Sequence, residues 1–74
     1  PREVMRAERT RKEMESLAEG IREEVDNAAR AEGLADRMAA LEGIAELSKH
    51  LRSKCNRELM ELQRMNEPTN PSQR

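Results

Sequence analysis

Apolar residues recur every three or four positions from Met14 to Met65, a spacing that leaves this chain little choice of fold. The series is Met14, Leu17, Ile21, Val25, Ala28, Leu34, Met38, Leu41, Ile44, Leu47, Leu51, Cys55, Leu59, Leu62 and Met65. Steps of three and four place side chains on one face of an α-helix, whereas a strand alternates with a period of two. Residues 2–67 contain no proline, and helix-favouring residues dominate the composition. The sequence therefore predicts an all-α, coiled-coil type of fold.

Gly33 decides whether the helix turns or continues. Glycine is common just after a helix end, where the backbone adopts left-handed angles, so we expect Gly33 to have a positive φ. Asp36 would then lie in the first turn of a second helix, where negative charge is favourable. We expect a helical module over residues 1–66, with helices at about 3–31 and 35–65, and a disordered tail over residues 67–74. One continuous coiled-coil helix is the alternative.

The positions of residues on either side of Gly33 favour an antiparallel hairpin. If the chain folds back there, facing residues have numbers that sum to about 64. Two stretches that are poor in apolar residues, 6–13 and 52–58, then face each other. Gly20 and Gly43 also fall opposite each other, and Leu41, Ile44 and Leu51 are expected to be buried. The predicted architecture is a two-helix antiparallel hairpin.

The apolar core of such a hairpin is too small to make a single copy of the chain very stable. The chain has 74 residues, of which 16 are Val, Ile, Leu or Met and none is aromatic. We therefore expect dimerisation into a four-helix bundle, so that the function is homo-oligomerisation or scaffolding by helix packing. The alternative is an adaptor that docks the helices of a different protein through the same apolar stripe. The expected interaction face comprises Met14, Leu17, Ile21, Val25, Leu34, Met38, Leu41, Ile44, Leu47, Leu51, Leu59 and Leu62.

Charge is unevenly distributed although the net charge is only −1. Residues 17–48 hold eight acids against three arginines, whereas residues 6–12 and 49–57 hold eight bases against one acid. We call these bases the basic waist: Arg6, Arg9, Arg11, Lys12, Lys49, Arg52, Lys54 and Arg57. The acidic turn end of one hairpin would cover the basic waist of another in an antiparallel dimer. Binding of a nucleic-acid backbone is less favoured, because no aromatic residue is present to stack on bases, and a solvated surface is the third interpretation.

No arrangement of residues points to catalysis. His50 and Cys55 are the only histidine and cysteine, and five residues on one helix separate them by about 140° around its axis. The sequence contains no phosphate-binding glycine motif, and one His with one Cys cannot form a structural zinc site. We expect no enzyme activity, cofactor, metal or small-molecule substrate. The single cysteine, with no apolar run of membrane-spanning length and no signal peptide, favours an intracellular protein without membrane contact, and the start at Pro1 is consistent with a piece of a longer protein.

Overall fold

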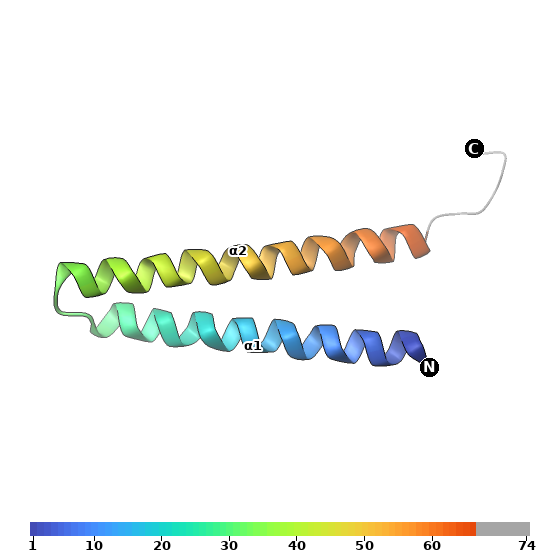
Figure 1. Cartoon of the computed structure of the whole chain (residues 1–74), viewed down its shortest axis with the longest axis horizontal. Helices are drawn as coiled ribbons and strands as arrows, with labels where there is room; N and C mark the ends of the chain where they lie inside the picture. The colour runs from blue at the N-terminus through green and yellow to red at the C-terminus, as the bar shows by residue number, and fades with distance from the viewer. Residues whose placement is uncertain (67–74) are drawn as a thin grey trace.

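Two long helices joined by a short turn make up the fold (Figure 1). The computed structural model describes residues 1–66, in which α1 spans Arg2–Arg30 and α2 spans Leu34–Met65. The helices lie side by side and run in opposite directions, so the predicted all-α hairpin is confirmed and the continuous helix is excluded. The expected tail lies outside the described residues.

The turn uses extended backbone rather than left-handed glycine. Ala31 ends α1 with φ −66° and ψ 132°, and its N–H donates to the Ala28 carbonyl at 3.4 Å. Gly33 precedes α2 with φ −101° and ψ 158°, angles that most residues can adopt. The expected positive φ at Gly33 is therefore wrong. Asp36 does lie in the first turn of α2, as expected, and its charge favours the helix start there.

The two helices meet along a narrow seam. On α1 and its cap, seven half-buried residues alternate in steps of four and three: Thr10, Met14, Leu17, Ile21, Glu24, Ala28 and Ala31. Arg6 and Gly20, beside this series, are half-buried as well. On α2 the matching set is Ala40, Ile44, Leu47, Leu51, Lys54, Glu58 and Glu61. This alternation is the heptad spacing of a coiled coil. Among the described residues only Ala40 is fully buried, with 5% of its surface exposed. Two helices alone therefore leave most seam side chains partly exposed to solvent.

Contacts across the seam fix how the helices are aligned. A Cβ placed on Gly20 would lie 3.2 Å from Leu47 Cδ1, and one on Gly43 would lie 3.0 Å from Glu24 Cδ. Both pairs of residue numbers sum to 67. The expectation that Gly20 and Gly43 lie opposite each other is therefore wrong, because each lies against a long side chain of the other helix. The helices are offset from the expected alignment by up to three residues, which is nearly one helical turn.

Candidate protein interaction surface

The predicted interaction face divides into two sets of residues. One set is half-buried in the seam: Met14, Leu17, Ile21, Ile44, Leu47 and Leu51. The other set is exposed: Val25, Leu34, Met38, Leu41, Leu59 and Leu62. Leu41, which we expected to be buried, has 53% of its surface exposed in this chain, and Leu34 has 75%. The apolar residues therefore do more than close the hairpin.

The exposed apolar residues of α2 belong to a second heptad series, which we call the open stripe. Its members are Leu34, Met38, Leu41, Ala45, Ser48, Arg52, Cys55, Leu59 and Leu62, all exposed and separated by alternating steps of four and three. From Leu41 onward each stripe residue follows a seam residue by one, which turns the stripe about 100° around the helix from the seam. Thus α2 carries two parallel heptad stripes, and the described part of the chain covers only one of them.

Helix α1 contributes apolar side chains to the same side of the hairpin. A shallow groove is lined by Ala7, Met14 and Ala18 of α1 together with Leu51 and Glu58 of α2. Leu51 and Glu58 line this groove from α2. The open-stripe residues Cys55 and Leu62 follow them by four residues, which is a rotation of only about 40° around the α2 axis. The open stripe therefore lies on the same side of α2 as the groove.

A neighbouring hollow continues the apolar surface of α1 along Ala18, Ile21 and Val25. We define the open face as the open stripe plus the α1 residues Val4, Ala7, Arg11, Met14, Ala18, Ile21, Val25 and Ala28, which also alternate in steps of three and four.

The middle of the open face is polar and its two ends are apolar. Ser48 and Arg52 interrupt the open stripe halfway along α2, and Arg11 interrupts the α1 side. The Arg11 guanidinium donates hydrogen bonds to Glu8 and, at 2.7 Å, to Glu15, and these two bonds raise the Arg11 pKa. Arg11 is therefore held by acids of its own helix.

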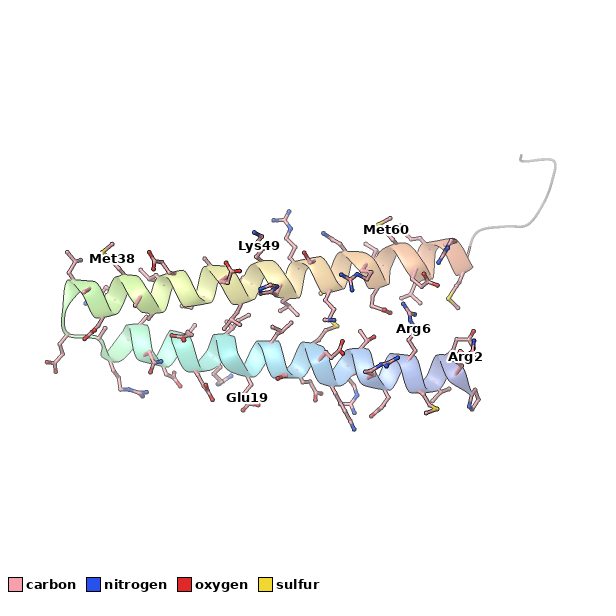
Figure 2. All side chains as sticks on the ribbon, viewed as in Figure 1. Arg2, Arg6, Glu19, Met38, Lys49 and Met60 are labelled. Carbon is pink, nitrogen blue, oxygen red and sulfur yellow. The ribbon has the colours of Figure 1, made fainter. Side chains whose placement is uncertain are left out.

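The structure pairs part of the basic waist with acids. Arg6, which points toward α2 in Figure 2, forms an ion pair with Glu58 at 2.8 Å, and Lys54 forms one with Glu13 at 2.7 Å. The hydrogen bond from Lys54, followed by its positive charge, lowers the pKa of the Glu13 carboxyl. With Arg11 also paired, five bases form no ion pair with the described residues: Arg9, Lys12, Lys49, Arg52 and Arg57. Lys49 points away from α1 in Figure 2. The waist is thus less positive than its sequence indicates.

His50 and Cys55 occupy separate exposed positions on α2. The His50 Nε2 atom lies 3.3 Å from a Glu46 carboxylate oxygen, one turn away on the same helix. Cys55 is an exposed free thiol on the open stripe. Within residues 1–66 no group of three or more His, Cys, Asp or Glu side chains is placed to hold a metal ion. Neither of the two helices has an apolar segment long enough to cross a bilayer.

Comparison with protein-family models, with curated proteins and with solved structures finds no match to this chain. The open face is therefore interpreted from its own geometry. Its principal features are the large exposed side chains at both ends of α2, the polar middle, and the position of both helices' apolar residues on one side of the hairpin.

Proposed function

We propose that this chain is a non-enzymatic protein–protein interaction module that self-associates, with two hairpins packing through their open faces into a four-helix bundle. The observation that carries this proposal is the open stripe, a second heptad series that leaves large apolar side chains exposed to water at both of its ends. Clusters of exposed large apolar side chains, such as those at the two ends of the stripe, mark interaction sites. Burying one Leu or Met side chain contributes roughly 1.5–3 kcal/mol, so several of them at each end provide a substantial driving force.

The weakness of the single hairpin supports the same proposal. Only Ala40 is fully buried within the described residues, and the seam is one side chain wide. A helix in a four-helix bundle packs against more than one neighbour and so needs a wider apolar surface than a two-helix seam. The two adjacent stripes of α2 match that need. The product of this module is assembly, and a scaffold or oligomerisation role follows from it.

An adaptor function is the second candidate, because the open stripe also has the spacing that accepts a single amphipathic helix of another protein. Binding to a nucleic-acid backbone has less support. Three of the eight waist bases, Arg6, Arg11 and Lys54, are already paired with acids, which reduces their attraction to phosphate, and the sequence has no aromatic residue to stack on bases.

Sedimentation equilibrium with circular dichroism tests the proposal over a wide range of protein concentration. A helical dimer whose melting temperature rises with concentration is expected. Because the chain has no Phe, Tyr or Trp, its concentration is measured from peptide-bond absorbance. A helical monomer at every concentration would contradict self-association and favour the adaptor.

Three truncations locate the interface. Leu41→Ala and Leu59→Ala remove side chains from the open stripe, and each is expected to weaken the dimer by roughly 2–5 kcal/mol if its site becomes fully buried there. Met60→Ala is the matched control, because Met60 is 68% exposed on the same helix but lies off the stripe. Equal weakening by Met60→Ala would show that association does not use this stripe.

A further inference from the structure

We propose that a second copy of the chain docks antiparallel on the open face, about a two-fold axis at the level of His50 on α2 and Ser16 on α1. This inference rests on the proposed function and adds to it the orientation and alignment of the partner. It follows from a symmetry in the open stripe, from the observed alignment of the hairpin and from the distribution of charge.

The open stripe is close to a palindrome in residue size. Pairing residue j with residue 100 − j of the second copy joins Met38 to Leu62, Leu41 to Leu59, Ala45 to Cys55, and Ser48 to Arg52. Large apolar residues thus meet large ones, small residues meet small ones, and the two polar residues meet each other. An antiparallel heptad pair alternates in this way, because each position of one type faces a position of the other type.

Other alignments of the stripe are worse. Shifting the second copy by one heptad, to a sum of 93, places Leu41 against Arg52 and Met38 against Cys55. A shift the other way, to 107, leaves Leu34, Met38 and Leu41 without a stripe partner, whereas the sum of 100 leaves only Leu34 without one. A parallel copy in register places Arg52 against its own counterpart, and a buried pair of like charges is costly. In the alignment that sums to 100, Arg52 instead faces the Ser48 hydroxyl, which can accept its hydrogen bond.

The α1 side of the open face pairs in the same manner. With residue numbers summing to 32, all eight members find a partner: Val4 with Ala28, Ala7 with Val25, Arg11 with Ile21, and Met14 with Ala18. The sums of 25 and 39, one heptad away, leave members at one end unpaired. The Arg11 stem packs on Ile21 while its guanidinium stays with Glu8 and Glu15 at the edge.

The two pairings agree on a single axis. Their centres are residue 16 on α1 and residue 50 on α2, whose numbers sum to 66. Within one chain, contacts across the seam join residues whose numbers sum to 67, as for Glu13 with Lys54, or to 64, as for Arg6 with Glu58. Residues 16 and 50 therefore lie at the same level along the hairpin. One two-fold axis therefore relates both helices to their counterparts in the second copy. The pairings of α1 and of α2 were derived separately, so this agreement is independent support for the alignment.

Charge favours the same orientation. In this alignment Lys54 lies level with Glu46 of the second copy, Arg9 with Glu23, and Arg6 with Asp26. The acidic turn half of each hairpin, residues 17–48, therefore lies along the basic waist of the other. A parallel copy would place acids level with acids and bases level with bases. Such complementarity selects the orientation more than it adds affinity.

Cysteine cross-linking tests the alignment with the native thiol in place. Ala45→Cys adds a second thiol that faces Cys55 of the other copy in the proposed dimer. Mild oxidation is expected to convert most chains to a covalent dimer. Residues 45 and 55 of one helix are about 15 Å apart, too far for an intrachain disulfide, which needs Cα atoms within about 7 Å. Tryptic digestion of that dimer should yield residues 38–49 joined to residues 55–57, because cleavage falls at Arg37, Lys49, Lys54 and Arg57.

The unsubstituted chain is the matched control. In the proposed dimer its two Cys55 residues are about 15 Å apart along the axis, so oxidation at the same concentration should leave it uncross-linked. A parallel dimer would instead join Cys55 to Cys55 in the unsubstituted chain, and would join the two introduced thiols at position 45 to each other in the variant. Either product would overturn the proposal. A second test mixes two variants, Ser48→Cys with Cys55→Ala and Arg52→Cys with Cys55→Ala. The mixture should cross-link position 48 of one chain to position 52 of the other, and because each chain carries a single thiol, no intrachain disulfide can form.

Sedimentation of the same samples separates the two proposals. A non-covalent dimer that forms neither the 45–55 nor the 48–52 cross-link would overturn this alignment and leave self-association standing. A monomer would overturn both. Circular dichroism of each reduced variant confirms that the hairpin is folded before oxidation, so a missing cross-link reports on docking.

Discussion

The turn half and the open half of the seam share one heptad spacing but are held together by different forces. Near the turn, small residues let the helices approach: Ala28, Ala31 and Ala40 lie in the seam, while Gly20 and Gly43 each receive a side chain from across it. Toward the termini the seam is mostly polar, with Thr10, Lys54, Glu58 and Glu61 at the positions that aliphatic residues occupy elsewhere.

This difference locates the stability of the hairpin. The ion pairs of the open half, Arg6 with Glu58 and Glu13 with Lys54, join partly exposed side chains, and such pairs contribute about 0–1 kcal/mol each. Aliphatic side chains in the turn half contribute more through burial. The same heptad spacing therefore specifies helix pairing along the whole seam. The turn half is stabilised by apolar burial, whereas the open half depends on ion pairs and on any partner that covers it.

The largest effect is expected from truncating the turn half. Leu47→Ala removes the side chain that lies over Gly20 and, because Leu47 is half-buried, should lower the free energy of unfolding by roughly 1–3 kcal/mol. Thr10→Ala, at an equivalent seam position in the open half, should cost less than about 0.5 kcal/mol, since surface-like substitutions rarely exceed that. Urea unfolding followed by circular dichroism at low concentration measures both. Similar costs at the two positions would show that stability is spread evenly along the seam.

The next largest effect, about 1 kcal/mol in the free energy of unfolding, is expected from alanine substitution of Gly20 and Gly43. In a helix Ala is more favourable than Gly by roughly 0.8–1.0 kcal/mol. At Gly43 an added Cβ meets the Glu24 carboxyl end at 3.0–3.3 Å, and that flexible end can swing into water, so Gly43→Ala should stabilise the hairpin. At Gly20 the Cβ lies 3.2 Å from Leu47 Cδ1, and a seam leucine has less room to move. Gly20→Ala should therefore show little or none of the gain, and equal stabilisation of both variants would contradict close packing at Leu47.

Much of the hairpin could be predicted from the sequence, because helical periodicity and the gaps at residues 6–13 and 52–58 are local patterns. The division of the apolar face was less obvious, yet it left a signal. The series runs in steps of three from Leu41 to Leu47 and in steps of four from Leu47 to Leu59, so it departs from a regular alternation. Those departures mark where the series passes from the open stripe to the seam and back again.

Alignment and turn geometry were harder to predict, because side-chain contacts decide them. A shift of three residues preserves the helical faces, so periodicity alone does not distinguish a sum of 64 from 67. At the turn, the glycine pattern predicted a left-handed residue, but Ala31 and Gly33 reverse the chain in extended conformations.

Substitution of Gly33 should therefore have a small effect. Its φ is −101° and no atom lies within 4 Å of an added Cβ, so alanine is expected to reduce the entropy of the unfolded chain by about 0.4–1 kcal/mol in free energy. Alanine is also a poorer N-cap than glycine, which offsets that gain. Thermal unfolding of Gly33→Ala should show a net change within about 0.5 kcal/mol. A loss well above about 1 kcal/mol would instead indicate a positive φ in solution.

The smallest expected effect concerns the charge that joins the open half, and it depends on pH. The hydrogen bond from Lys54 lowers the Glu13 pKa below its ordinary value of 4.5, so the folded chain binds this proton more weakly than the unfolded chain. The resulting stabilisation is present above the unfolded pKa and is lost as the pH falls through the lower, folded pKa. Glu13→Gln should therefore lower the melting temperature slightly at neutral pH, and the difference should shrink as the pH falls below 4.5 and disappear once both states are protonated. Glu19→Gln is the control, because Glu19 points away from α2 (Figure 2).

Added salt should shrink the Glu13 effect at neutral pH, since exposed charges are screened within about 10 Å at 0.1 M. An effect that persists at low pH and high salt would show that Glu13 acts through packing, and that the two halves of the seam differ less than their residues indicate.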